Sequence, residues 1–152
     1  MGLSIGDPAP DFCLPDGQGN SVCLSALRGH RVVLYFYPRD NTEGCTKEAC
    51  GFRDAYAAFE ERDAIVLGIS TDDRKSHEKF TRKFQLPFSL LSDEGGQVAA
   101  AYDSYGLKKF MGKELQGIFR NTFVISPQGT IEQIYTKVKP VGHAEQVLVD
   151  LG

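Results

Sequence analysis

The sequence lacks the features that mark several classes of protein. No apolar run approaches the roughly 18 residues that a membrane-spanning helix needs, and residues 1–8 have neither the basic region nor the apolar core of a secretory leader. The formal net charge is −3 at pH 7, and there is no basic cluster, which argues against a nucleic-acid-binding surface. We therefore expect a cytosolic protein that binds neither membranes nor nucleic acids.

The cysteines and histidines also lack the spacing of common metal and redox sites. They are Cys13, Cys23, Cys45 and Cys50, with His30, His77 and His143. No two cysteines form C-x-x-C and no two histidines stand at ligand spacing, so a zinc site is not expected. The histidines are interpreted as surface or capping residues. Structural disulfides are rare in a cytosolic chain of this size, so we expect at least one cysteine to be reactive.

Length and patterning predict one α/β domain over residues 1–152. The composition, with 41% hydrophobic and 24% charged residues, is globular and sufficient for one core. Apolar runs typical of strands lie at 32–37, 64–70 and 118–126, and helix-like segments lie at 45–62, 74–85, 94–102 and 143–151. Their order predicts a central mixed sheet with helices on both faces, preceded by a β-hairpin. Residues 106–117 are predicted to be a loop.

The expected N-terminal hairpin carries one cysteine on each arm. Cys13 lies in a proline-rich extended segment before the turn at 16–20, and Cys23 lies in the short strand that follows. Neither is near an obvious base or helix start, so both are interpreted as packing residues. A facultative disulfide between the two arms is the alternative.

The stretch from Pro38 to Cys50, P-R-D-N-T-E-G-C-T-K-E-A-C, is where we expect the chemistry. Pro38 closes a strand-like run, and residues 41–44 are turn and helix-start residues, so Cys45 falls in the first turn of a helix. A thiol there meets unpaired backbone N–H groups and the positive end of the helix dipole. Both favour the thiolate, which is the nucleophilic form.

Helical geometry relates Cys45 to the residues after it. At about 100° per residue, Ala49, Phe52, Tyr56 and Phe59 lie within roughly 40° of Cys45 and form one apolar face, where a cysteine is more often a packing residue than a catalytic one. The Cα atom of Cys50 lies about 8 to 9 Å from that of Cys45, whereas a disulfide needs less than about 7 Å. A bond between them therefore requires the start of this helix to unwind.

Four motifs resemble the peroxiredoxins, and within them the bacterioferritin comigratory protein or PrxQ type. They are G-D-P-A-P-D-F at 6–12, Y-F-Y-P-R-D-N-T-E-G-C-T-K-E-A-C-G-F-R-D at 35–54, G-I-S-T-D at 68–72 and R-N-T-F-V-I at 120–125. The second contains the spacing Pro38-x3-Thr42-x2-Cys45 of the family's active site. The resemblance covers essentially the whole chain and implies a thioredoxin-like fold that reduces hydroperoxides without metal, haem or flavin.

The resemblance also implies roles for single residues. Cys45 matches the peroxidatic cysteine, Thr42 the hydroxyl that hydrogen-bonds thiolate and peroxide, and Pro38 the residue that shields the site. The motif overturns the packing interpretation of Cys45. Glu43 stands where many relatives carry proline, and we expect that difference to leave the mechanism unchanged.

Three further residues complete the expected site. Arg120 matches the active-site arginine, Glu48 the acid that orients it, and Cys50 the resolving cysteine found in many members of this type. Arg120 keeps its charge at any working pH and so favours the thiolate continuously. On local evidence alone, Arg120 and Glu48 would be surface charges and Thr42 an ordinary helix cap.

We therefore expect a thiol peroxidase that is reduced by thioredoxin or a similar dithiol protein. Because the resolving cysteine lies in the same chain, a monomer is chemically sufficient, although a dimer stays open. A dithiol-disulfide oxidoreductase is the first alternative, disfavoured because C-x4-C replaces C-x-x-C. The second is a redox sensor in which Cys45–Cys50 switching exposes a surface.

Overall fold

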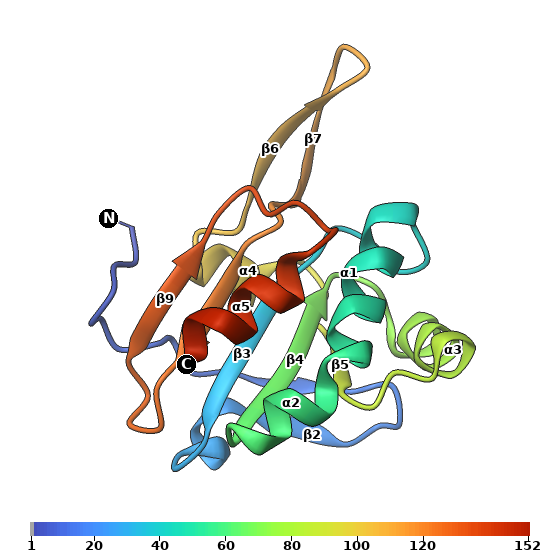
Figure 1. The fold of residues 1–152 in the computed structure, drawn as a ribbon. Coiled ribbons are helices and arrows are strands. Elements are labelled where there is room, and N and C mark those ends of the chain that lie inside the picture. The colour runs from blue at the N-terminus through green and yellow to red at the C-terminus, as the bar shows by residue number, and fades with distance from the viewer. Residues whose placement is uncertain (1) are drawn as a thin grey trace.

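The computed structural model describes residues 2–152, and its centre is a five-stranded mixed sheet (Figure 1). The strand order is β5 (Ser89–Ser92), β4 (Ala64–Ser70), β3 (Arg31–Phe36), β8 (Thr122–Ile125) and β9 (Ile131–Tyr135). Strands β3, β4 and β5 are parallel, and β8 and β9 are added in antiparallel pairs. The βαβ unit predicted around the Cys45 helix is therefore present, with β3 and β4 as neighbours.

Two apolar clusters cover the two faces of the sheet, because the central strands are hydrophobic on both sides. In β3, Val33 and Tyr35 point into one cluster, whereas Val32, Leu34 and Phe36 point into the other. This alternation follows from the two-residue period of a strand. An apolar run such as that of β3 is typical of a strand with no wet face.

Helices pack on both faces, as predicted. The elements whose side chains enter the cluster of Val33 and Tyr35 are α1 (Glu43–Asp54), α2 (Tyr56–Glu61), α3 (Arg74–Phe84) and α5 (His143–Leu151). The other face is covered by α4 (Gln97–Ala101), the 3-10 helix Leu24–Leu27 and the N-terminal segment. A turn at Ala55 divides the predicted 45–62 helix into α1 and α2. None of the described helices is long and apolar enough to cross a bilayer.

The N-terminal hairpin forms as predicted, but its cysteines are not simple packing residues. Strands β1 (Cys13–Pro15) and β2 (Ser21–Cys23) pair in register, and Cys13 and Cys23 form a disulfide. The packing interpretation was wrong and the alternative is confirmed. The amide of Leu24 donates to the carbonyl of Phe12, which makes Cys13 and Cys23 a non-hydrogen-bonded pair. Side chains of such pairs lie closest together across two strands.

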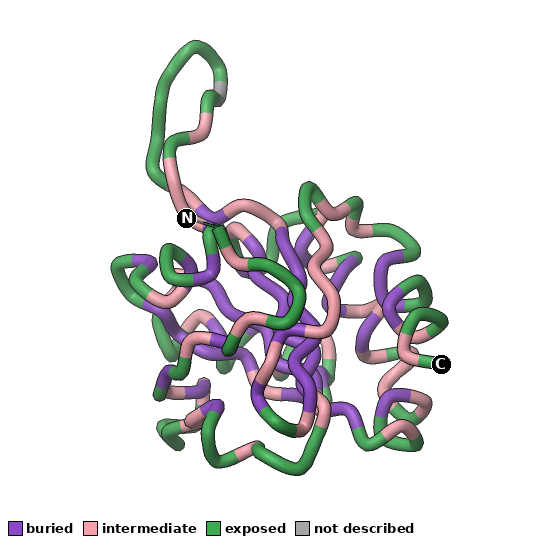
Figure 2. The backbone as a smooth tube through the Cα atoms, turned by 90° about the vertical axis from the view of Figure 1, so that its left-hand side faces the viewer, coloured by how far each residue is buried: buried purple, intermediate pink, exposed green. Residues whose placement is uncertain are grey.

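The loop predicted at residues 106–117 is instead a second hairpin. Strands β6 (Tyr105–Phe110) and β7 (Lys113–Ile118) are joined by Met111 and Gly112, both at positive φ, and they project from the body of the molecule (Figures 1 and 2). Residues 113–116 are all exposed. Because these positions bury neither face, they lack the apolar alternation by which a strand is predicted from sequence.

Candidate active site

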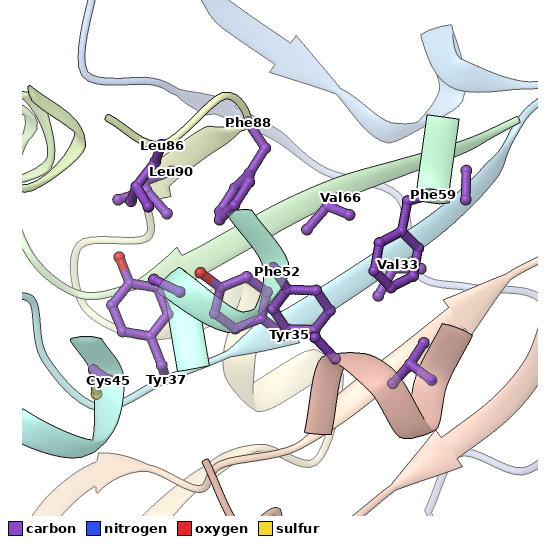
Figure 3. Close-up of a cluster of buried hydrophobic side chains, with 14 of the residues drawn as sticks. Val33, Tyr35, Tyr37, Cys45, Phe52, Phe59, Val66, Leu86, Phe88 and Leu90 are labelled. Atoms are coloured by element: carbon purple, nitrogen blue, oxygen red, sulfur yellow. The ribbon is translucent and has the colours of Figure 1, made fainter. Parts of the chain in front are cut away.

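Cys45 lies in the first turn of α1, which residues 37–42 join to the carboxyl end of β3. Thr42 is the N-cap residue, with extended backbone angles, so Cys45 is the third residue of the helix. Its side chain is a free thiol and the residue is only 1% exposed. Figure 3 shows it at one end of the cluster that α1 forms on the sheet, to which Ala49 and Phe52 also belong. The predicted apolar face of the helix, with Cys45 on it, is therefore present.

Arg120 joins the sulfur of Cys45 to a buried carboxylate. It lies between β7 and β8, and its Nη2 donates to Cys45 Sγ over 3.5 Å. Its Nη1 donates to Glu48 Oε1 over 2.7 Å, from a side chain that is itself only 17% exposed. Residues 72 to 75 positions apart in the sequence thus meet at one point, as the resemblance implied. A guanidinium held in this way presents a fixed positive charge to the sulfur.

Glu48 is the most deeply buried charged group of the site. Its side chain is fully buried, and its Oε2 has no hydrogen-bond partner among the described residues. Burial raises the pKa of Glu48 to about 7, although the charge and hydrogen bond of Arg120 act in the opposite direction. Glu48 therefore changes its charge near neutral pH, unlike an exposed glutamate.

Thr42 and Pro38 lie in the segment that joins β3 to the first turn of α1. Among the described residues, the hydroxyl of Thr42 donates to the carbonyl of Arg39 over 3.0 Å and makes no bond to Cys45. This bond uses the hydroxyl proton and leaves the oxygen free to accept one from a substrate. Pro38 is half-buried at the start of the same loop. Thr42 and Cys45 thus come together through one helix start, while the side-chain contact that the resemblance implied is not made.

Gly44 lets two other segments approach this helix start. A Cβ atom at residue 44 would lie 3.2 Å from both Arg120 Nη2 and Pro140 Cγ. The segment before α5 therefore covers the first turn of α1 at close range. Any side chain at residue 44 would push against the arginine that contacts the sulfur.

Cys50 is a half-buried free thiol in the same helix as Cys45. Because α1 is continuous from Glu43 to Asp54, the two Cα atoms are separated by the about 8 to 9 Å of ideal helical geometry. The structure is therefore that of the reduced pair, and it leaves the predicted unwinding as a requirement for any bond between them.

Two residues near the site were missed in the sequence. Lys108 of β6 donates from Nζ to the carbonyl of Ile118 over 2.7 Å, and its pKa is lowered by burial and then by Arg120, with Cys45 acting in the opposite direction. It is thus a second cation within electrostatic reach of the sulfur. Lys108 was missed because residues 106–117 were predicted to be a loop.

His143 is the second residue near the site that was missed in the sequence. Its Nε2 lies 2.8 Å from Thr122 Oγ1, and burial, followed by Arg120, lowers its pKa to about 4. The prediction that the histidines are surface or capping residues is therefore wrong for His143, which is 4% exposed, and also for His77, which is fully buried. It holds for His30, which pairs with Asp63 at the surface. Burial of a single histidine depends on contacts between distant segments, which no local pattern reveals.

Asp40, Asp72 and His77 place potential metal ligands within 4.8 Å of one another. Their ligand atoms are already engaged: Asp40 Oδ2 accepts from Ser76, Asp72 Oδ2 accepts from Ser70, and both His77 nitrogens face oxygen atoms. Hydrogen-bond donors aimed at the carboxylates fit a polar network better than a cation site.

Comparison with known proteins gives a consistent set of similarities. Residues 5–134 match the AhpC/TSA family. The chain is 45% identical over 148 residues to a putative peroxiredoxin Bcp of Coxiella burnetii, covering 97% of this chain and 98% of that one. It is also 45% identical over 151 residues to peroxiredoxin Bcp of Bacillus subtilis, covering 99% and 96%.

Solved structures agree with the sequence comparison. A mutant of Xylella fastidiosa PrxQ superposes with a TM-score of 0.93 at 35% identity, covering 99% of this chain and 96% of that one. A Xanthomonas campestris bacterioferritin comigratory protein, described for alkyl peroxide reduction, superposes with a TM-score of 0.90 at 38% identity, covering 98% and 95%. The predicted thioredoxin-like peroxiredoxin fold is thereby confirmed.

Proposed function

The chain belongs to the AhpC/TSA family, among its Bcp/PrxQ peroxiredoxins, and from this premise we propose how its residues divide the work of a thiol peroxidase. Cys45 is the peroxidatic nucleophile, and Arg120, oriented by Glu48, is its electrostatic partner. Cys50 is the resolving thiol. The observation that carries this assignment is the pair of bonds from Arg120, one to Cys45 Sγ and one to Glu48 Oε1.

The first step oxidises Cys45. Its thiolate attacks one peroxide oxygen, so that an S–O bond forms while the O–O bond breaks and the second oxygen leaves with the electron pair. That oxygen takes up a proton and departs as water or an alcohol, and Cys45 is left as the sulfenic acid. Donors fixed around the reacting oxygens stabilise the developing charge. Arg120 is the charged donor, the hydroxyl oxygen of Thr42 accepts a hydrogen bond from the peroxide, and Pro38 shields the site from water.

The second step forms an intramolecular disulfide. The Cys50 thiolate attacks the Cys45 sulfur, the S–S bond forms, and the hydroxyl leaves as water after taking a proton. Since α1 holds the two cysteines too far apart, its first turns unwind before this attack. A dithiol protein such as thioredoxin then reduces the disulfide by two thiol–disulfide exchanges.

The substrates are hydrogen peroxide and organic hydroperoxides. The Xanthomonas campestris relative, described for alkyl peroxide reduction, supports the organic class at 38% identity. Residues 1–152 act as one domain, and a monomer suffices because both cysteines lie in one chain. Dithiol reductants of the thioredoxin type are abundant in the cytoplasm, where we place the protein.

The test compares peroxide consumption by wild type, Cys45→Ser and Cys50→Ser, first with a thioredoxin system and then with dithiothreitol. We expect Cys45→Ser to be inactive with both. We expect Cys50→Ser to lose thioredoxin-driven turnover but to react once with peroxide. The matched control is the double variant Cys13→Ser/Cys23→Ser, which should keep full turnover.

Other outcomes identify other functions. Normal turnover of Cys50→Ser with thioredoxin would remove Cys50 from the resolving role and leave an outside thiol. Reduction of insulin disulfides without peroxide would indicate a dithiol-disulfide oxidoreductase. A single oxidation with no turnover in the wild type would indicate a sensor.

A further inference from the structure

A buried aspartate–histidine pair fastens the loop that precedes Cys45. The loop connects β3 to α1, and Asp40 lies in it, two residues before Thr42. His77 on α3 approaches it with Nδ1 at 2.7 Å from Asp40 Oδ2, and the two side chains are 0% and 3% exposed. Nothing in the reaction described above uses either residue.

The surroundings of the ring indicate which protons His77 carries. Its Nε2 lies 3.0 Å from the carbonyl oxygen of Leu91 in β5. A carbonyl oxygen only accepts, so Nε2 must carry a hydrogen. On the other side, Nδ1 lies 2.7 Å from Asp40 Oδ2 and 3.4 Å from the hydroxyl oxygen of Tyr37, and so short an approach to Asp40 requires a proton between nitrogen and oxygen. The pair therefore holds either an imidazolium with a carboxylate or an imidazole with a carboxylic acid.

The other contacts of Asp40 favour the ionised carboxylate. The hydroxyl of Tyr37 donates to Oδ1 over 2.5 Å, and the hydroxyl of Ser76 donates to Oδ2 over 2.8 Å. Burial, and then the charge of Asp40, raise the pKa of Tyr37 well above its ordinary value, so Tyr37 remains a neutral donor. Hydrogen bonds donated to a carboxylate stabilise its charged form. The shared proton therefore belongs to His77.

The backbone of the loop is held as firmly as its side chain. The amide of Asp40 donates to Asp72 Oδ2 over 2.7 Å, and Ser70 donates to the same oxygen over 2.7 Å. Lys83 of α3 also donates to the side chain of Asn41 over 3.1 Å. The loop is thus attached to the end of β4 and to α3. It ends at Thr42, whose carbonyl accepts the first helical hydrogen bond, from the amide of Thr46.

We propose that His77 is a positioning residue for the peroxidase reaction, and that its imidazolium, paired with Asp40, fixes the loop from which Thr42 and the first turn of α1 begin. The proposal rests on the function assigned to Cys45. In the reduced protein, the Asp40–His77 pair holds Thr42 in the position from which its hydroxyl orients a peroxide. When α1 unwinds, the same pair keeps residues 37–42 in place, so that the helix can reform when the Cys45–Cys50 disulfide is reduced.

The first experiment replaces the charge but keeps a donor. In His77→Asn, the side-chain amide can still donate to Asp40 without a positive charge. We expect the second-order rate of Cys45 oxidation by hydrogen peroxide, measured by competition with a haem peroxidase, to fall about tenfold or more. The matched control is His30→Asn, because His30 forms the same kind of pair with Asp63 over 2.8 Å but at the surface. The control should react at the wild-type rate.

Three comparisons separate positioning from a purely structural role. The rate is measured well below the melting temperature, so that lower stability alone leaves it unchanged. Asp40→Asn and the double variant Asp40→Asn/His77→Asn complete a double-mutant cycle. If the two residues act together, the loss of rate in the double variant will differ strongly from the sum of the two single losses. Ser76→Ala, which removes one donor to Asp40 and leaves the pair, should lower the rate a few-fold and serves if the buried variants do not fold.

The protonation is read directly from the wild type. Nitrogen-15 NMR of the reduced protein at pH 7.5 should show hydrogens on both ring nitrogens of His77. An unprotonated nitrogen, or wild-type oxidation rates in folded His77→Asn or in Ser76→Ala, would overturn the proposal. If wild type did not react with peroxide at all, the assignment of Cys45 would be overturned instead. Failure of the proposal for His77 can therefore be distinguished from failure of the proposed function.

Discussion

Cys13 and Cys23 are bonded to each other across a two-stranded hairpin, whereas Cys45 and Cys50 are free thiols five residues apart in one helix. The first pair needs no movement of the backbone to close, because directly opposite residues of two strands already lie within disulfide range. The second cannot close without breaking helical hydrogen bonds. Bond formation is thus a local event in the hairpin and a conformational change in α1.

The two pairs also lie on different sides of the sheet. Cys45 belongs to the cluster that α1 forms with one face. In the hairpin, Leu14 and Val22 pack against the cluster on the other face, and the two-residue period of a strand turns Cys13 and Cys23 away from it. The sheet therefore separates the hairpin sulfurs from Cys45, and they are not placed to resolve its sulfenic acid. Because Cys13 is exposed and Cys23 is half-buried, this disulfide is accessible to a thiol reductant.

The largest difference between the pairs should appear when Cys45 and Cys50 are oxidised. We expect amide hydrogen exchange in residues 45–52 to speed up about a hundredfold or more, because an unwound turn loses the protection of its hydrogen bonds. Exchange in the β1–β2 hairpin should stay unchanged. Mass spectrometry of wild type before and after one equivalent of peroxide measures both segments.

Cys50→Ser is the control for this experiment, since its Cys45 is oxidised but cannot form the disulfide. It should keep the slow exchange of the reduced helix. Unchanged exchange at 45–52 in oxidised wild type would contradict the unwinding that helical geometry demands.

The same contrast explains what could be read from the sequence. Cys45, Thr42 and Glu48 were found because one local motif holds them, and β3 and β4 were found because their runs are apolar. The partners of Asp40 were missed, since His77 lies 37 residues away and only the packing of α3 beside the loop joins them. Long-range closure of this kind leaves no periodic signal. Arg120, which lies 72 residues from Glu48 and 75 from Cys45, was placed only through its motif.

The β1–β2 hairpin, which carries Cys13 and Cys23, shows a second limit of prediction from sequence. Its strands were predicted from a proline-rich extended segment and the turn at 16–20, but its disulfide was only an alternative, because register decides whether two cysteines face each other. The β6–β7 hairpin was not predicted at all. It buries little of either face, so its sequence pattern is that of a polar loop. Sequence reasoning therefore succeeded where an apolar run or a motif constrains the residues, and failed where strand register or packing between distant segments does.

Removing the hairpin disulfide should lower stability but spare catalysis. For a cross-link with a sequence separation of 10 residues, the chain-entropy model gives a loss of about 2 to 3 kcal/mol in the free energy of unfolding. Urea unfolding of Cys13→Ser/Cys23→Ser against oxidised wild type measures this loss. Wild type with the disulfide reduced is the control and should be equally destabilised. A fall in peroxidase turnover of the folded double variant would contradict the independence of the two pairs.

The smallest effect concerns the charge beside Cys45. The folded-state pKa of Glu48, about 7, lies above the ordinary value of 4.5, so folding favours its protonated form. The resulting stabilisation is complete below about pH 4.5 and is lost as the pH rises through 7. Glu48→Gln does not titrate, so between pH 5.5 and pH 7.5 its stability should improve relative to wild type by about 2 kcal/mol.

Two variants that keep Glu48 are the controls: Glu43→Gln, at an exposed position of the same helix, and the double variant Cys13→Ser/Cys23→Ser. In both, the difference in stability from wild type should be the same at the two pH values. Urea unfolding at the two pH values measures all four proteins. Parallel behaviour of Glu48→Gln and wild type would mean that Arg120 keeps Glu48 ionised throughout. The surroundings of Cys45 would then be no more sensitive to pH than those of the hairpin pair.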